Sequence, residues 1–544
     1  MTKSRDIANS TSTLDVDGGT IKLDGNYPVG TGNVALGDTA LDSVEAGGTG
    51  NVAIGANAGT ALTLGDESVA VGFEALLTAT TGSENVGIGH SALKLTTGNS
   101  NVAVGKNALT ANSSASNNTA VGTSALGANT TASFNTAVGK SALGANTVGA
   151  FNVAIGQAAL ELDTKGSRST AIGRAALASQ NFTSATDTYN TAVGNNAGIN
   201  VTTGVQNTLI GALSGDAITT GGNNVAVGYL SLSANTTASD NVAFGVNALS
   251  SNTTGIQNTA LGRSALRAST TGTRNTALGY NALTAGTTAT SNVAIGDHAL
   301  QSKTTTGNDN TAVGTYAGSG MTSGQRNTLI GAGSGEQITT GSSNTILGRF
   351  NGNQGGLDIR TSSNRIVLSD GDGNPRLHID NSGDTRIGTG TLGQNGGINL
   401  YPTGSNGSGH ITTNKTQSGE AVFLQLQHSS SNIGGITYNN TSVSFNTSSD
   451  YRLKENVDYT WDATARLKQL KPARFNFIAD ADTTVDGFLA HEAQAVVPEC
   501  VTGAKDAVDA DGNAVMQGID QSKLVPLLVK TIQELEARIT ALEG

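Results

Sequence analysis

The segment Asn135-Thr136-Ala137-Val138-Gly139-Lys140-Ser141-Ala142-Leu143 recurs, with small changes, through the first two thirds of the chain. The core of this segment occurs nineteen times, and each copy ends at a glycine, from Gly37 to Gly348. In order, a copy usually has Asn, then Thr or Val, then a small residue, then an aliphatic residue, then the closing Gly. Fourteen of the eighteen intervals between these glycines are 17 residues long. A period this regular is typical of stacked-repeat proteins.

Each repeat predicts one coil of a β-solenoid or β-roll. Polar and apolar residues alternate briefly before a glycine, which indicates two short strands with a bend between them. Seventeen residues are too few for two strands and a full helix. The repeat array contains no proline between Pro28 and Pro375, as a continuous sheet requires. We therefore expect a mainly β protein whose rod of about 19 coils is roughly 90 Å long, at about 4.8 Å per strand spacing.

The small inward residues of each coil, Ala, Val, Ile and Leu, bury little surface in one chain. A solenoid also needs capped ends and neighbouring coils for stability. We therefore expect a homotrimer in which three chains share the core around one axis. The coils resemble the head repeats of trimeric bacterial adhesins, in which related repeats wind a left-handed β-roll. The period here is longer, so the handedness stays open.

Composition restricts the partners. The chain has 544 residues and a net charge of −11, which disfavours nucleic acid because phosphate binding needs basic patches. Cys500 is the one cysteine, so no disulfide forms within the chain. No apolar run follows Met1, and no stretch is long enough to span a bilayer, so we expect neither a secretory signal nor membrane insertion.

The chain divides into four segments by composition. We expect residues 1–30 to be an attachment segment and first cap, 31–350 the repeat rod, and 351–447 a β-rich shaft or tip. Residues 448–544 bring charged and bulky side chains and predict a small α+β domain.

This last segment ends in an amphipathic pattern that predicts a coiled-coil-like helix. Its apolar residues are spaced alternately three and four apart: Val525, Leu528, Ile532, Leu535, Ile539 and Leu542. By peptide rules Ile and Leu at these positions favour two strands, whereas the rod favours three chains, and this conflict stays open.

The start of the C-terminal segment carries the one motif that predicts chemistry. Ser449-Asp450-Tyr451-Arg452-Leu453-Lys454 is followed by Leu467 to Phe477, by Gly487 to Glu499, and by Gln517 to Lys530. These four blocks resemble the intramolecular chaperone domain of phage tail spikes and fibres, the self-cleaving endosialidase-type peptidase domain. One departure is His491, which stands where the family more often has Gln.

The resemblance implies a domain that trimerises the chain, assists its folding and then releases itself. Ser449 would be the nucleophile and Lys454 its base, with cleavage between Ser448 and Ser449. A serine hydroxyl needs such a base, and a lysine serves only in its neutral form. The alternative interpretation of these residues is a solvated polar linker.

Other candidate sites have simpler explanations. Asp370, Asp372 and Asn374 begin like a calcium loop, but Pro375 stands where that loop needs Gly. Asp509, Asp511 and Asn513 have the same fault, so we expect hairpin turns at both places. The six histidines lack metal-ligand spacing, and we expect no metal and no cofactor.

The function that best fits these features is a phage tail fibre, assembled in the host cytoplasm and carried on the virion. Its partners would be its own copies, a tail or baseplate protein at the N-terminus, and a host receptor, either glycan or protein. A cellular trimeric adhesin or another surface-binding solenoid, such as an ice-binding protein, is the alternative. A glycan-degrading spike lacks support because no acidic pair lies in an aromatic context, so autoproteolysis is the one expected enzymatic activity.

Overall fold

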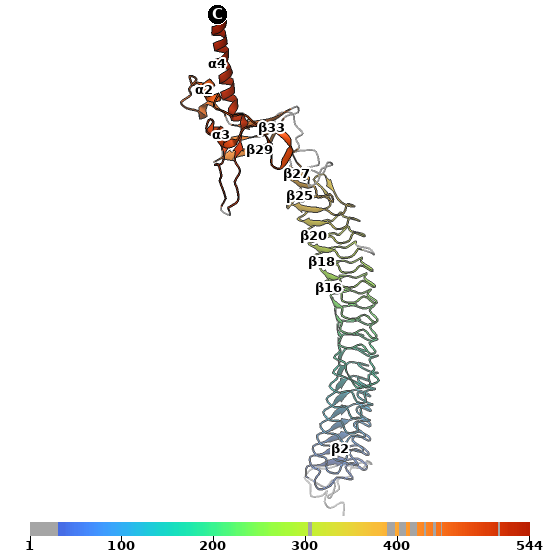
Figure 1. Ribbon diagram of the computed structural model, residues 1–544. Helices are drawn as coiled ribbons and strands as arrows, with labels where there is room; N and C mark the ends of the chain where they lie inside the picture. The colour runs from blue at the N-terminus through green and yellow to red at the C-terminus, as the bar shows by residue number, and fades with distance from the viewer. Residues whose placement is uncertain are drawn as a thin grey trace, which may run out of the picture. The chain divides into compact units, whose positions relative to one another are not determined.

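The structure is a computed structural model that describes residues 31–302, 307–388, 398–401, 410–413, 421–428, 431–438, 442–447, 449–509 and 512–544. The chain divides into two compact units, Met1–Gly419 and Glu420–Gly544 (Figure 1). The first unit is a long stack of coils, and the second contains hairpins and helices. The attachment segment expected at 1–30 lies outside the described residues.

The first unit is the predicted β-solenoid of about 19 coils. Each coil contributes one strand of three residues, and successive strands pair in parallel with middle residue on middle residue, as in Ala120 on Ala137. The coil strands are β1 (Val34–Leu36), β2 (Val52–Ile54), β3 (Val69–Val71), β4 (Val86–Ile88), β5 (Val102–Val104), β6 (Thr119–Val121), β7 (Thr136–Val138), β8 (Val153–Ile155), β10 (Thr170–Ile172), β12 (Thr191–Val193), β13 (Thr208–Ile210), β14 (Val225–Val227), β15 (Val242–Phe244), β16 (Thr259–Leu261), β17 (Thr276–Leu278), β18 (Val293–Ile295), β19 (Thr311–Val313), β20 (Thr328–Ile330) and β21 (Thr345–Leu347).

The expectation of two strands per coil is wrong. After the closing glycine of β7 the chain turns instead, and Ser141 and Leu143 take left-handed backbone angles, with φ of 56° and 50°. The polar and apolar residues alternate along this part because the turn points successive side chains inward and then outward. This pattern in the sequence resembles that of a strand. The longest interval between closing glycines, from Gly173 to Gly194, contains β11 (Thr186–Asp187), which pairs in parallel with β9 (Gly166–Ser167) apart from the main ladder.

The closing glycine of the motif is required for two independent reasons. Gly139 has φ of 135°, a conformation that side chains disfavour. A Cβ atom built on Gly139 would also lie 2.5 Å from the carbonyl oxygen of Gly156 in the next coil. The other closing glycines repeat this contact, so the coils stack at a distance that only glycine permits.

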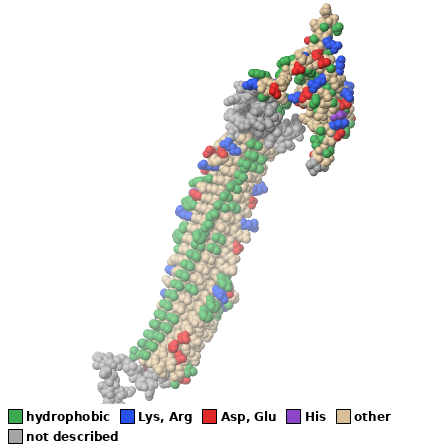
Figure 2. Space-filling model, turned by 90° about the vertical axis from the view of Figure 1, so that its left-hand side faces the viewer, with side chains coloured by type: hydrophobic (Ala, Val, Ile, Leu, Met, Phe, Trp, Pro, Cys, Tyr) green, Lys and Arg blue, Asp and Glu red, His purple; other side chains and the backbone are tan. Residues whose placement is uncertain are grey.

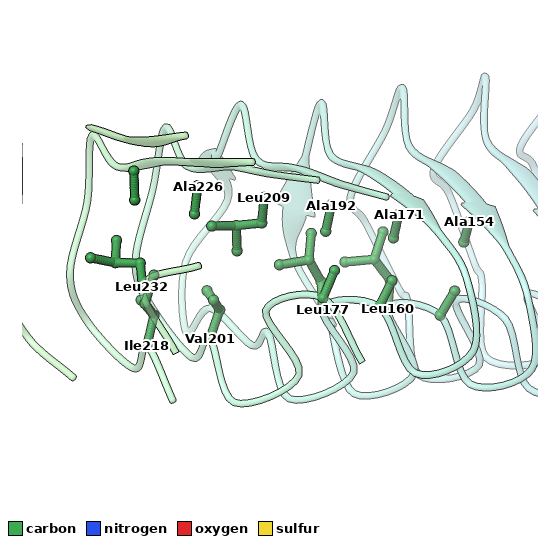
Figure 3. Packing of buried hydrophobic residues seen from close by; sticks show 14 of the residues in the cluster. Ala154, Leu160, Ala171, Leu177, Ala192, Val201, Leu209, Ile218, Ala226 and Leu232 are labelled. Carbon is green, nitrogen blue, oxygen red and sulfur yellow. The ribbon is translucent and has the colours of Figure 1, made fainter. Parts of the chain in front are cut away.

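Inside each coil a small residue from the strand faces a larger one from the turn. Figure 3 shows the alanines of the strands, such as Ala154 and Ala171, opposite the leucines Leu160 and Leu177. Two coils reverse this order. Where the strand carries Leu209, the turn carries Gly215, and its Cβ would lie 2.7 Å from the leucine. In other coils both positions are small, as at Ala192 and Gly198, and the buried Val201 three residues later supplies the larger side chain.

Buried asparagines tie the coils together. The Nδ2 of Asn135 donates to the carbonyl of Gly149 in its own coil, at 3.0 Å. Its Oδ1 accepts from the backbone N–H of Asn152 in the next coil, at 2.9 Å. A second row passes through Asn129 and Asn146, joined side chain to side chain at 2.9 Å. These side chains satisfy backbone groups that the turns leave without sheet partners.

The outward side of the strands is apolar. The third residue of each coil strand is aliphatic or Phe, from Leu36 in β1 to Leu347 in β21. Many of these side chains, which we call the apolar ridge, are between 36% and 52% exposed, as at Ile155, Phe244 and Leu261. Figure 2 shows hydrophobic side chains aligned along one face of the solenoid.

The stack ends in antiparallel strands. β24 (Ile366–Ser369) continues the ladder in parallel from β21, and β25 (Pro375–Ile379) then folds back on it. The remaining strands of this unit are β22 (Asn353–Gln354), β23 (Leu357–Asp358), β26 (Thr385–Ile387), β27 (Ile398–Tyr401) and β28 (His410–Thr413). The region expected to be β-rich after residue 351 therefore contains strands on both sides of the unit boundary.

The second unit begins with a sheet of three strands, β29 (Ala421–His428), β30 (Ser431–Tyr438) and β31 (Val443–Thr447). It continues with the 3-10 turn η1 (Tyr451–Leu453), α2 (Ala463–Leu467), β32 (Ala473–Phe477), β33 (Asp480–Gly487), α3 (Ala490–Gln494), η2 (Pro498–Cys500), β34 (Val501–Thr502), β35 (Gly518–Ile519), η3 (Gln521–Leu524) and α4 (Val525–Glu543). No helix in the described parts of the chain has the length and apolar character needed to cross a membrane.

Candidate autoprocessing site and chaperone domain

The candidate nucleophile and base lie in contact. The Nζ of Lys454 donates a hydrogen bond of 2.8 Å to the Oγ of Ser449. Residues five apart do not meet on an α-helical face, but here the 3-10 turn η1 folds the chain back between them. Both side chains are exposed in the single chain. Ser448, the other residue of the expected cleavage site, lies outside the described residues.

Asp450 and Arg452 hold this turn. The carboxylate of Asp450 caps η1 by accepting from the backbone N–H of Arg452 at 2.9 Å. The guanidinium of Arg452 also donates two hydrogen bonds to this carboxylate, at 2.9 and 2.7 Å. These contacts with Arg452 lower the pKa of Asp450. The pair therefore positions the backbone that brings Ser449 and Lys454 together.

A small apolar core lies further along this unit. It contains Ala463, Ala493, Val497, Cys500, Val501, Leu524 and Leu527, with Trp461 and Phe488 packed against it. Glu534 of α4 caps the first turn of α2, accepting from the backbone N–H groups of Ala463 and Thr464 at 2.8 and 2.7 Å. Hydrogen bonds from Thr464 and Ala463 lower the pKa of Glu534. The long helix and the rest of the domain thus form one body.

Comparison with protein families gives one match, and it begins at the candidate nucleophile. Residues 449–502 match the family described as chaperone of endosialidase. The C-terminal region is an endosialidase-type chaperone domain. Comparison with curated proteins and with solved structures gave no match. The matched range includes Ser449 and Lys454, whereas the resemblance of residues 517–530 to the same family stays a prediction.

The chaperone domain has consequences for the whole chain. A domain of this type implies trimeric assembly of the protein itself. Together with the β-solenoid it indicates a tail-fibre-like, phage-associated protein.

The apolar face of α4 lacks a partner within the described residues. The six residues of the predicted heptad seam are between 43% and 86% exposed: Val525, Leu528, Ile532, Leu535, Ile539 and Leu542. Exposing such a seam along a helix is unfavourable in water. The chaperone domain therefore carries a surface suited to further chains.

A groove of about 840 Å³ lies in the second unit, and sequence reasoning did not find it. One side comes from β30 and β31, which precede the expected cleavage point. The other comes from the chaperone domain and carries the charged residues Arg466, Glu499, Asp520 and Lys523. The three-stranded sheet and the residues that follow Ser449 therefore share this groove.

Sequence reasoning also missed an aromatic cluster on the solenoid. Phe134 and Phe151 stack at 5.2 Å with rings inclined by 2°, and the guanidinium of Arg168 lies 5.0 Å from the Phe151 ring centre. Tyr189 of the next coil lies on the other side of Arg168, at 5.9 Å. The sequence contains a signal for this cluster. All four residues occupy the same position of successive repeats, directly before the Asn or Ser that begins the motif.

The remaining candidates take structural roles. Asp370 accepts backbone hydrogen bonds from Asp372 and Asn374, which makes this segment the predicted turn between β24 and β25. Cys500 is buried in the chaperone core, and burial raises the pKa of its thiol. Within the described ranges, no three His, Cys, Asp or Glu side chains are grouped as a metal site would require.

Proposed function

We propose that this protein is a phage tail fibre that contacts the host with its solenoid and is processed by its own chaperone domain. The contact between Ser449 and Lys454, at the first residues of the matched family range, is the observation that carries the proposal. The chaperone domain would assemble three chains and then leave by cleavage of the Ser448–Ser449 peptide bond.

The proposed chemistry uses the two side chains in contact. A neutral Lys454 amine takes the proton of the Ser449 hydroxyl, and Oγ attacks the carbonyl carbon of Ser448. The C–N bond breaks as the nitrogen of Ser449 gains a proton, which leaves an ester between Ser448 and Ser449. Water then hydrolyses this ester. Burial of the pair by partner chains would favour a neutral amine and so promote the first step.

The apolar ridge supports three chains side by side. It runs the length of the coil ladder and carries no charged residue at any third strand position. Fully burying an exposed Leu or Ile contributes about 1.5–3 kcal/mol, and each ridge side chain, already partly buried, would contribute a fraction of this. The exposed seam of α4 supplies a second apolar surface of the same kind. Both surfaces fit further copies of this chain.

Expression of the full chain tests the proposed cleavage. Denaturing electrophoresis and intact mass should give fragments of about 448 and 96 residues, as expected for a Ser/Lys dyad that cuts before Ser449. Ser449→Ala should give one uncut chain. Ser444→Ala, a change to an exposed serine in β31, is the matched control and should cleave normally. An uncut parent chain would remove the autoprocessing part of the proposal and leave the rod untouched.

The aromatic stack of Phe134, Phe151, Arg168 and Tyr189 is a candidate contact surface for a host glycan. Its rings are about half exposed, and exposed aromatic rings beside hydrogen-bonding groups suit sugars. Glycan-array binding by the fibre should be lost in Phe151→Ala and kept in Phe73→Ala, a change to an exposed ring elsewhere on the rod. Equal binding by both variants would place the receptor site elsewhere.

A further inference from the structure

A second column of aromatic side chains runs along the later coils of the solenoid, one or two residues after the closing glycines. The rings of Tyr280 and His298 lie 5.2 Å apart, and those of His298 and Tyr316 lie 5.0 Å apart with an inclination of only 13°. The guanidinium of Arg263 lies 5.7 Å from the centre of the Tyr280 ring. Successive coils thus form one stack, which an arginine closes at its N-terminal end.

The other end of the stack is open. The backbone N–H of Tyr316 donates to Asp297, and that of Gly333 donates to Thr315, both at 2.8 Å, so Gly333 follows Tyr316 at the same place in the next coil. Gly333 is the one glycine among the nineteen residues that stand two after a closing glycine. Because His298 covers one face of the Tyr316 ring, the opposite face is directed toward a coil that has no side chain at this place.

A carboxylate borders this gap. A Cβ atom built on Gly333 would have Oε2 of Glu336 at 3.4 Å, and no other described atom beyond the adjoining residues lies within 4 Å of it. The backbone N–H of Glu336 donates to the carbonyl of Gly333 at 3.1 Å, which holds the two residues together. Tyr316 and Glu336 are both exposed, so a group from solvent can reach the ring and the carboxylate.

The solenoid already contains a group that fits between a ring and a carboxylate. In the first aromatic stack the guanidinium of Arg168 lies over the rings of Phe151 and Tyr189, and its Nε pairs with Asp187 at 3.1 Å. A guanidinium is planar, is attracted to a ring face, and donates in a fork that matches a carboxylate. The gap beside Tyr316 offers the same two partners, with a glycine where the first stack has arginine.

We propose that the gap bounded by Tyr316, Gly333 and Glu336, which we call the Tyr316 notch, binds the guanidinium of an arginine side chain from a partner protein. The guanidinium extends the stack by one member, and the carboxylate of Glu336 accepts from its N–H groups. Lysine fits less well, because its ammonium is a strongly hydrated point charge without a flat face. A neutral sugar can pack on the ring but leaves the carboxylate without a counter-charge.

One such contact is weak, because both the cation–π contact and the ion pair lie at an exposed surface. Each chain of a trimer presents one notch, so a partner with several arginines gains affinity by binding more than one at a time. The site goes beyond the proposed fibre function. It lies outside the chaperone domain and does not depend on cleavage or on the candidate glycan surface.

Chromatography of the full chain on arginine-agarose tests the notch. Wild type should elute at higher salt than from lysine-agarose of equal ligand density, a comparison that controls for the net charge of −11. Gly333→Leu fills the notch without changing the charge, and Leu213 has this position in another coil with φ of 55°. This variant should lose the preference for arginine. Tyr229→Leu, which removes an exposed ring elsewhere on the solenoid, is the matched control and should keep it.

Saturation-transfer NMR with N-acetyl-L-arginine amide measures the same contact without a matrix. Tyr316→Leu should raise the Kd of this probe about two- to fivefold, as loss of a cation–π contact at an exposed site implies. Equal retention on the two resins, equal behaviour of wild type and Gly333→Leu, or a stronger NMR signal from a methyl pyranoside than from the arginine probe would overturn the proposal. An uncut parent chain would leave it unaffected.

Discussion

Lys454 and Ser449 meet across one 3-10 turn, with Nζ donating to Oγ at 2.8 Å. The turn is short enough that the two side chains need no other element to bring them together. The Asp450–Arg452 pair fixes its backbone. The geometry therefore supplies proximity in the single chain, whereas desolvation of the pair would come from partner chains.

Replacing Lys454 with Arg separates the two roles of this contact. An arginine can still donate to Ser449, but it stays protonated in proteins and cannot act as a base. We expect Lys454→Arg to abolish cleavage, with one uncut chain on denaturing gels and in intact mass. Cleavage at the wild-type rate would show that Lys454 acts only as a hydrogen-bond donor.

The closing glycines should tolerate no side chain. In Gly228→Ala the new Cβ would lie 2.6 Å from the carbonyl oxygen of Gly245, at a residue with φ of 132°. A backbone conformation reserved for glycine costs about 1–3 kcal/mol before the clash is added. We expect faster hydrogen exchange in β14 and β15, measured by mass spectrometry.

Gly286→Ala is the control for this change. Its Cβ would meet only side-chain atoms of Leu283 and Ala289, at 3.4 to 3.6 Å, and its φ is not left-handed. We expect exchange close to wild type or slower. Equal acceleration in both variants would contradict the assigned role of the closing glycines.

The buried carboxyl of Asp163 should make the rod sensitive to pH. Burial raises its pKa above the ordinary value of 3.8. Its contribution to stability is therefore full below about pH 4 and is lost as pH rises through the raised folded-state pKa. Asp163 accepts hydrogen bonds from Gln180 and from the backbone of Gly166, at 2.7 and 2.9 Å.

Asp163→Asn should remove this sensitivity, because Asn146 occupies the same position one coil earlier. We expect thermal unfolding of the variant to occur at a higher temperature than wild type at pH 8, with a smaller difference at pH 4. Asp187→Asn, a change to an exposed carboxylate nearby, is the control. A lower unfolding temperature for Asp163→Asn at pH 8 would contradict the pKa direction.

The apolar ridge should be needed for assembly. Leu261→Lys places a charge on the ridge, where burial against a second chain would be unfavourable. We expect loss of trimers in crosslinking and light scattering. Ile256→Lys changes a side chain of similar exposure in the preceding turn and should keep them. Trimers in both variants would place the interface on another face.

The sequence period predicted the coil number and the parallel solenoid, because every Gly marks a contact with its neighbour. The period did not predict that each coil has one strand. Turns with left-handed residues such as Ser141 and Leu143 point successive side chains inward and outward, as a strand also does. The exchange of Leu209 and Gly215 between strand and turn was also missed. A Gly four residues after the closing Gly, with an apolar residue three further on, does not single out this exchange, because Gly198 and Val201 show the same pattern beside Ala192.

The candidate site was predicted by resemblance rather than by spacing, because Ser and Lys five residues apart occur in many linkers. The cluster of Arg365, His378, Asp380 and Arg386 at the end of the solenoid could not be predicted from sequence. Its residues come from separate strands, and only the register of Val367 with His378 and Arg386 shows that the apolar row continues into them.

The glycine contacts between coils make length an independent property of this protein. Each coil has its own closing glycine, its own buried asparagine and its own core side chains. Whole repeats can therefore be gained or lost without changes in the neighbouring coils. The echo of Leu209 with Gly215 at Leu329 with Gly335 fits such copying by blocks. The number of coils can therefore change separately from the side chains that the solenoid presents on its surface.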